Sequence, residues 1–149
     1  MDPKADYTLS FDRDTQQPGR IHAYLARSYW AEGIPLSLVE QSIANSLCVG
    51  VFQKGEQVGF ARIVTDTTTF AYLCDVYVLE EHRGKGLASW MLEAIAAHPG
   101  LQGLRRVMLA TRDAHALYAK HGFVPVKKPE ALMEILKVAP WRQPTGPAA

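Results

Sequence analysis

The stretch Arg83-Gly84-Lys85-Gly86-Leu87-Ala88 places two glycines and two cations between a strand-like run and an amphipathic helical run. Gly84 and Gly86 let the backbone approach a ligand closely because they carry no Cβ. The first N–H groups of the helix that follows have no acceptor within it, and the helix dipole attracts anions there. Since Arg83 and Lys85 add positive charge, the turn favours a diphosphate over a single carboxylate.

Two well-known phosphate loops do not match this turn. A Walker loop needs Ser or Thr directly after Gly-Lys, and here Gly86 follows Lys85. A dinucleotide fingerprint needs Gly or Ala where Ser89 stands. These mismatches disfavour a small nucleotide-binding switch. From the spacing alone, an alternative is that the two glycines only turn the chain and bind nothing.

The composition narrows the function classes further. The chain has 149 residues, 48% of them hydrophobic, and its 16 Lys and Arg against 15 Asp and Glu give a formal charge of +1. That balance disfavours a general nucleic-acid partner. The start lacks a secretory pattern and no apolar run could span a bilayer, so we expect a cytoplasmic protein with no membrane partner. Cys48 and Cys74 lie in apolar stretches and are predicted to be free, buried thiols.

The elements around the turn predict one mixed α/β domain over residues 1–139, with a flexible tail over 140–149. Helices are expected from Arg20, over Ser37–Leu47, from about Leu87 to His98 and over Ala114–His121. Strands are expected at Tyr7–Phe11, Cys48–Gln53, Val58–Thr65, Phe70–Leu79, Val107–Thr111, Phe123–Val126 and Leu132–Lys137, with Lys54-Gly55 as a hairpin turn. The fold class is therefore α/β, with about six to seven strands in a mixed sheet and about four helices.

Two motifs resemble those of the GNAT superfamily of acyl-CoA-dependent N-acyltransferases. The run from Arg83 to Ala88 is similar to its R/Q-x-x-G-x-G/A motif, and it follows a strand ending Val76-Tyr77-Val78. Downstream, Leu117-Tyr118-Ala119-Lys120-His121-Gly122-Phe123 is similar to its L/F-Y-x-x-x-G-F motif. The resemblance implies a twisted mixed sheet that splays open between its fourth and fifth strands, with acetyl-CoA in the gap.

The resemblance also implies roles for individual residues. The pantetheine arm of acetyl-CoA would pair with the backbone of the fourth strand at Val76, Tyr77 and Val78. The diphosphate would lie on the N–H groups of the turn, so the cofactor-binding residues would include Arg83, Gly84, Lys85, Gly86, Leu87, Ala88 and Ser89. The Tyr118 hydroxyl would protonate the leaving thiolate, for which an ordinary tyrosine pKa of about 10 is suitable. A core ring with a satisfied hydroxyl is the alternative for Tyr118.

An attacking amine must first lose its proton, and Asp75 is the candidate base. An amine with a pKa near 10.4 costs roughly 4–5 kcal/mol to hold neutral at pH 7. Asp75 lies in an apolar strand, where a carboxylate must find a partner or shift its pKa. Strand alternation predicts that it shares a face with Leu73 and Tyr77, opposite Val76 and Val78. A relayed water and a purely structural carboxylate are the alternatives.

The acceptor pocket is predicted from aromatic and acidic residues near the first two helices and the central strands, namely Tyr29, Trp30, Glu32 and Tyr72. Such a lining suits a small cationic amine. We therefore expect an N-acetyltransferase that moves an acetyl group from acetyl-CoA to a primary amine of a small molecule in a direct ternary complex. A non-catalytic acyl-CoA-binding or sensing module and acetylation of a protein amine are the alternatives. No metal is expected, and the chain would be a monomer or a homodimer.

Overall fold

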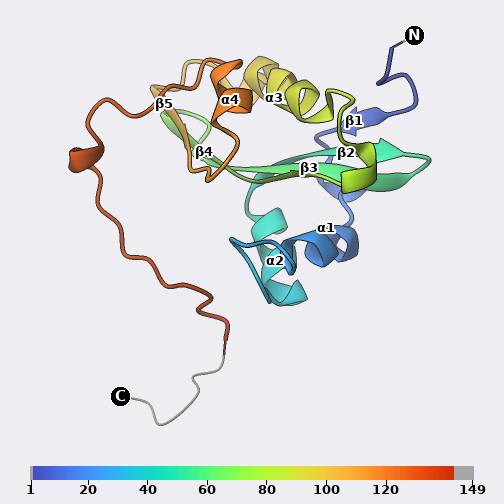
Figure 1. The fold of residues 1–149 in the computed structure, drawn as a ribbon, viewed down its shortest axis with the longest axis horizontal. Helices are drawn as coiled ribbons and strands as arrows, with labels where there is room; N and C mark the ends of the chain where they lie inside the picture. Colours follow the sequence, from blue (N-terminus) through green and yellow to red (C-terminus); the bar gives the residue numbers. More distant parts are fainter. Residues whose placement is uncertain (1, 143–149) are drawn as a thin grey trace.

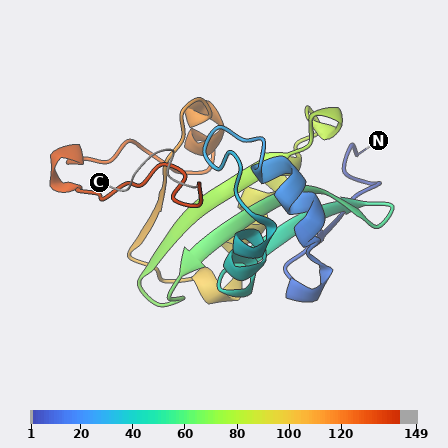
Figure 2. The same cartoon turned by 90° about the horizontal axis from the view of Figure 1, so that it is seen from below.

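The computed structural model describes residues 2–142, and within them one five-stranded sheet forms the centre of the molecule (Figures 1 and 2). The strand order follows the chain, with antiparallel neighbours except for the parallel pair β4–β5. The strands are β1 (Thr8–Ser10), β2 (Leu47–Gln53), β3 (Glu56–Thr65), β4 (Phe70–Val78) and β5 (Arg106–Leu109). The mixed α/β class expected from the sequence is confirmed.

Within the described part of the chain, four α-helices cover the two faces of this sheet. In Figure 1, α1 and α2 lie on one face, and α3 and α4 lie on the other. Their bounds are α1 (Pro18–Leu25), α2 (Leu36–Ala44), α3 (Leu87–Ala97) and α4 (His115–Ala119), with short 3₁₀ turns at Arg13–Thr15, Glu80–His82, Pro99–Leu101 and Pro129–Ala131. The parallel pair β4–β5 is connected through α3, which the chain needs in order to return to the starting edge.

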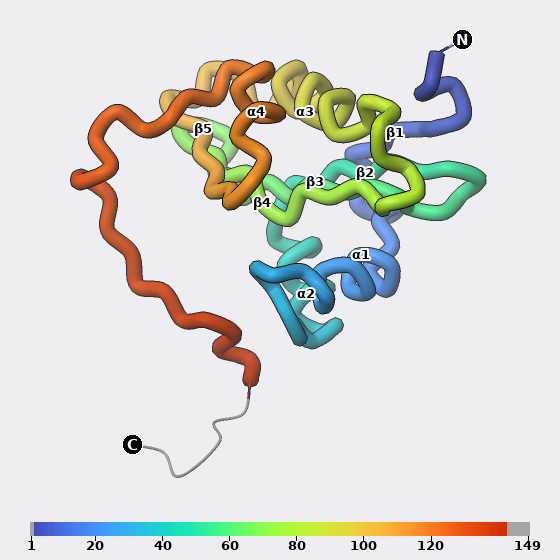
Figure 3. Tube along the Cα trace, viewed as in Figure 1, coloured from blue at the N-terminus to red at the C-terminus, as the bar shows by residue number. Residues whose placement is uncertain are grey.

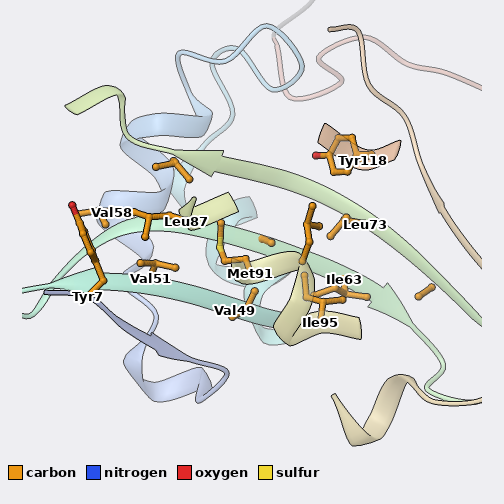
Figure 4. Packing of buried hydrophobic residues seen from close by; sticks show 14 residues of the cluster. Tyr7, Val49, Val51, Val58, Ile63, Leu73, Leu87, Met91, Ile95 and Tyr118 are labelled. Atoms are coloured by element: carbon orange, nitrogen blue, oxygen red, sulfur yellow. The ribbon is translucent and has the colours of Figure 1, made fainter. Parts of the chain in front are cut away.

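Each face of the sheet has its own hydrophobic cluster, because alternate strand residues point to opposite sides. On one side, the buried α3 residues Leu87, Met91 and Ile95 pack with Val49 and Ile63 of the sheet (Figure 4). On the other side, helices and strands contribute the cluster Ile21, Leu25, Ala31, Val39, Ile43, Cys48, Phe60 and Tyr77. Packing on both faces therefore holds the sheet in place, and β4 with it.

The β2–β3 hairpin has the turn predicted from the sequence. Lys54 and Gly55 both have positive φ, 51° and 78°. Two successive positive φ values are those of a type I′ turn, whose twist matches that of paired strands.

The expectation of six to seven strands is wrong. The two strands predicted at 123–126 and 132–137 do not form, and the chain beyond Phe123 instead leaves the sheet as an extended arm (Figure 3). The alternating apolar residues there suit a strand, but a strand needs a neighbour, and none of the described strands pairs with this segment. The sheet consequently ends at β5.

The arm returns to the body near its end. The indole N–H of Trp141 donates to the backbone oxygen of Glu32 at 3.1 Å, and Arg142 approaches the Glu32 carboxylate at 3.3 Å. Most of the tail expected over 140–149 lies outside the described residues, so the proposed boundary at 139 stays a prediction.

Both cysteines are free thiols, Cys48 buried and Cys74 half-buried. Burial raises the pKa of Cys48 to about 11 and that of Cys74 to about 12, so both stay protonated at neutral pH. Among the described residues, no helix is both long and apolar enough to cross a bilayer.

Candidate active site

The turn between β4 and α3 presents a row of unpaired backbone donors. Gly84 and Gly86 both have φ of +78°, and a Cβ added at either position would meet only open space. Trp90 is the first residue of the helix whose N–H finds an acceptor, the Gly86 oxygen. Within residues 2–142, none of the N–H groups from Gly84 to Ser89 forms a hydrogen bond. Six adjacent free donors at a helix N-terminus are suited to bind an anion.

The two cations of the turn are held by neighbouring elements. Arg83 donates from Nε to the Val78 oxygen at 3.0 Å and from its terminal nitrogen to the Tyr24 hydroxyl at 3.0 Å. Lys85 donates to the Tyr7 hydroxyl at 3.3 Å. Arg83 therefore fixes the turn to β4 and α1, and both charges stay beside the free N–H groups.

Strand β4 loses its outer neighbour half-way along its length. It pairs with β5 only from Phe70 to Leu73, where β5 ends at Leu109. Closer to the turn, the Leu79 N–H donates to Val58 of β3 at 2.8 Å. Because donors alternate along an antiparallel strand, the backbone groups of Val78 then face away from β3. The sheet is thus open beside the last residues of β4, where the resemblance placed the pantetheine arm.

A β-bulge interrupts β4 in this open part. Phe60 pairs with Tyr77 and Arg62 with Cys74, so Ala61 faces two residues of β4. Asp75, one of the two, has a φ of +54°, which a non-glycine residue rarely adopts. The bulge lies beside the gap and sets the direction of the side chains there.

The bulge breaks the strict alternation of side chains that the sequence predicted for β4. Leu73 packs in the cluster beneath α3, but Tyr77 packs in the cluster with α1 and α2. An extra residue reverses the side to which every later side chain points. Asp75 and Leu73 therefore lie on opposite faces, contrary to the prediction. Val76 and Val78 lie with the α3 cluster, opposite Tyr77, in agreement with it.

Asp75 is paired on both carboxylate oxygens. It accepts from the Trp30 indole N–H and from Arg62 Nε, each at 2.8 Å. The Arg62 and Asp75 side chains are 20% and 11% exposed. Burial alone would lower the pKa of Arg62, yet the adjacent Asp75 keeps that pKa above its ordinary value. No motif or spacing in the sequence pointed to Arg62 as this partner.

Tyr118 lines a cavity of about 1130 Å³ bounded by α3, β5 and α4. Its side chain is buried, packs edge-on against Phe123, and has a pKa raised above the ordinary tyrosine value, chiefly by burial. Within the described residues, the Tyr118 hydroxyl donates to no protein group. Nearby, His121 Nε2 lies 3.1 Å from the Ser89 hydroxyl, which joins α4 to the start of α3.

The predicted acceptor residues are brought together only in part. Tyr29 and Trp30 are exposed on the α1–α2 connection with their rings 5.0 Å apart, and Trp30 reaches β4 through Asp75. The Arg112 guanidinium lies 3.7 Å from the centre of the Tyr29 ring, a contact that the sequence did not predict. Tyr72 is partly exposed on β4.

Glu32 differs from the aromatic candidates in its contacts. Its carboxylate pairs with Arg142 of the arm. Glu32 therefore already has a cationic partner, unlike a carboxylate that is free to bind an amine. Among residues 2–142, no group of three or more His, Cys, Asp or Glu could hold a metal ion.

The last residues of β4 have no outer strand beside them and lead into six unpaired N–H groups, an arrangement suited to an extended, anionic ligand. Comparison with known families gives the class: residues 10–123 match the model described as the acetyltransferase (GNAT) family. The chain therefore belongs to the GNAT family.

Individual relatives agree with this placement. A Gibberella zeae protein that carries an acetyltransferase name is 36% identical over 79% of this chain and 78% of its own. A GNAT-family structure from Xanthomonas campestris is 48% identical, with a TM-score of 0.89 over 92% of this chain and 97% of the other. At 15% identity, an Elizabethkingia anophelis GNAT acetyltransferase solved with acetyl-CoA bound shares the fold, with a TM-score of 0.61 over 83% and 80%.

Proposed function

We propose that this chain is an N-acetyltransferase that moves the acetyl group of acetyl-CoA to a primary amine of a small molecule. The observation that carries the proposal is the run of six free N–H groups from Gly84 to Ser89, placed where β4 becomes open along its outer edge. The diphosphate of the donor would lie on these groups, and its extended arm would add to β4 through Val76 and Val78, as a strand adds to a sheet edge.

The reaction would proceed in one ternary complex. Acetyl-CoA supplies the acetyl group as a thioester. The amine nitrogen forms the new bond to the carbonyl carbon as the carbon–sulfur bond breaks, and Tyr118 donates its proton to the departing sulfur. Its raised pKa suits this role, because the hydroxyl then keeps its proton throughout the neutral range.

The amine must give up a proton, and Asp75 would accept it directly or through a water. The carboxylate lies beside Trp30, on the side where the aromatic candidates gather. Both carboxylate oxygens already accept hydrogen bonds, one from Trp30 and one from Arg62, so a water between the amine and Asp75 fits the site better than direct transfer. Tyr29, Trp30 and Tyr72 would hold a small cationic amine against their ring faces.

The first test is thermal melting of the purified chain with acetyl-CoA, CoA, ATP and NAD, followed by thiol release across a panel of amines. A native-state ligand at a hundredfold excess over its dissociation constant adds about 2.7 kcal/mol, which moves a melt by several degrees. We expect a shift with acetyl-CoA and CoA, and amine-dependent thiol release with small amines. If neither acetyl-CoA nor CoA shifted the melting temperature, acetyl-CoA would be rejected as the donor. A shift without release from any small or peptide amine would favour a sensing module.

A further inference from the structure

The arm beyond α4 exposes an unusual amount of apolar surface. Met133 is 97% exposed, Ile135 93% and Val138 82%, and Leu136 and Leu132 are also exposed. These side chains follow one another in a strand-like run, Leu132-Met133-Glu134-Ile135-Leu136-Lys137-Val138. A contiguous run of apolar side chains exposed to water is typical of a binding surface for another molecule.

The backbone of the arm is also unpaired. Between Val124 and Pro140, the described hydrogen bonds are local: two lie around the turn at Pro129–Ala131, and one runs from the Arg142 N–H to the Ala139 oxygen. None of them joins this segment to the body. Extended backbone with free donors and acceptors is a strand without a neighbour. The arm therefore offers both a free strand edge and apolar side chains.

The same chain presents a matching receptor. Strand β5 stands last in the sheet, so its outer edge has no partner strand among the described residues. Beside it lies the cavity of about 1130 Å³, whose walls include the apolar residues Leu101, Leu104, Val107 and Leu109. Val107 itself is 42% exposed.

One opposite-charge contact is available between arm and receptor. The arm carries Glu130 and Glu134 together with Lys127, Lys128 and Lys137, and of these Glu134 and Lys137 lie in the strand-like run. Glu134 can pair there with Arg105 or Arg106 at the start of β5. Opposite charges on neighbouring strands favour pairing and suppress the approach of a like edge.

Both ends of the arm are fixed to their own body. At one end Phe123 packs on Tyr118, and at the other Trp141 and Arg142 bind Glu32. Held in this way, the arm forms an arch that stands away from its own sheet (Figures 1 and 3). Residues 132–138 therefore lie away from their own β5 (Figure 3).

We propose that residues 132–138 of each chain pair with the outer edge of β5 of a second copy of this chain, their apolar side chains covering the part of the cavity wall formed by Leu101, Leu104 and Val107. Every copy has one arm and one free edge, so a two-fold dimer satisfies both at once and closes the assembly. This proposal does not depend on the proposed function.

The first test is the mass of the full chain in solution, measured by sedimentation equilibrium over a wide concentration range. We expect twice the 16.5 kDa of one chain. The double variant Met133→Asp/Ile135→Asp should weaken the dimer by about tenfold or more, since apolar anchors in an interface dominate its affinity. Leu38→Asp, at a 37% exposed position on α2, is the matched control and should leave the dimer intact. A monomeric parent chain overturns the proposal.

A second experiment identifies what the arm contacts. Chains with photoreactive benzoyl-phenylalanine in place of Ile135 are mixed with isotope-labelled unmodified chains, irradiated, and digested for mass spectrometry. Strand exchange predicts crosslinks from the arm of the light chain to residues 101–109 of the heavy chain. Crosslinks only within the light chain would show that the arm folds back on its own sheet, and crosslinks between chains at another surface would show a different dimer. Either result overturns the proposal.

Discussion

The carboxylate of Asp75 on β4 pairs with Nε of Arg62 on β3 at a distance of 2.8 Å, across the bulge that opens the sheet. Both side chains are largely buried, so neither charge is well solvated. Removing one member of such a pair leaves the other charge without compensation. The pair is therefore structural, whatever else Asp75 does.

Asp75→Asn should lower the free energy of unfolding by about 3 kcal/mol, because it leaves Arg62 buried and unpaired. Chemical denaturation measures this loss. Arg20→Gln is the control, since it removes an exposed pair with Glu56 and should change stability by no more than about 0.5 kcal/mol. An equal, small effect of both variants would contradict the structural role.

The same variant also tests Asp75 as the base. If Asp75 accepts the proton of the amine, the folded Asp75→Asn enzyme should lose kcat by about 100-fold. If a water carries the proton to bulk solvent, kcat should stay within a fewfold of the parent while stability falls. Measuring kcat well below the melting temperature of the variant separates the two effects.

Gly86→Ala should weaken acetyl-CoA binding. The substitution puts a Cβ among the free N–H groups at a φ of +78°, which also costs about 1 kcal/mol of stability. Gly55→Ala is the matched control, because Gly55 has the same φ of +78° and the same open surroundings in the β2–β3 turn. We expect similar melting temperatures for the two variants but a raised KM for acetyl-CoA only in Gly86→Ala. Equal KM values would remove the turn from the binding site.

The sequence predicted what depends on local pattern and missed what depends on pairing. The type I′ turn at Lys54-Gly55 and the α3 start after Gly86 each contain a glycine, the residue type that permits positive φ most readily. The bulge at Asp75 has no such signature, because it arises from the register between β3 and β4. Strict alternation therefore placed Leu73 and Asp75 on one face, and the structure does not.

The arm shows the same limit, because its local pattern was predicted correctly and its pairing was not. The alternation at Leu132–Lys137 is a strand pattern, and the segment is indeed extended. Whether it joins a sheet depends on a neighbour, which the pattern cannot specify. In the candidate site, the two motifs located the turn and Tyr118. The pairing of Arg62 with Asp75 and the contact of Arg112 with Tyr29 depend instead on how separate elements pack against one another.

Asp66 should make the stability of the fold depend on pH in the acid range. Its carboxylate accepts hydrogen bonds from the Thr68, Thr69 and Phe70 backbone and from the Thr69 hydroxyl, in the turn between β3 and β4. These bonds, the Thr69 hydroxyl first among them, hold the pKa of Asp66 well below its ordinary value. A lowered folded-state pKa gives stability that is complete above the unfolded pKa of about 4 and is lost as the pH falls below it.

Unfolding midpoints in urea from pH 6 down to pH 2 measure this dependence. Asp66→Asn should flatten the decline below about pH 4 relative to the parent chain. Asp14→Asn is the control, because among the described residues the Asp14 carboxylate accepts no hydrogen bond. The unfolding midpoints of this variant should fall with pH as those of the parent do. Identical curves for Asp66→Asn and the parent would show that the turn contributes nothing pH-dependent.

Tyr118→Phe should lower kcat by about 100-fold and leave the KM for acetyl-CoA within a fewfold, because it removes a proton donor and keeps the buried ring. Burial raises the pKa of Tyr118, so the parent should hold full activity through neutral pH and lose it only as the pH rises above the ordinary tyrosine value of about 10. In the variant that alkaline decline should vanish from the residual activity. A variant with normal kcat would make Tyr118 a core ring, whereas a variant that keeps the decline would assign that titration to another group.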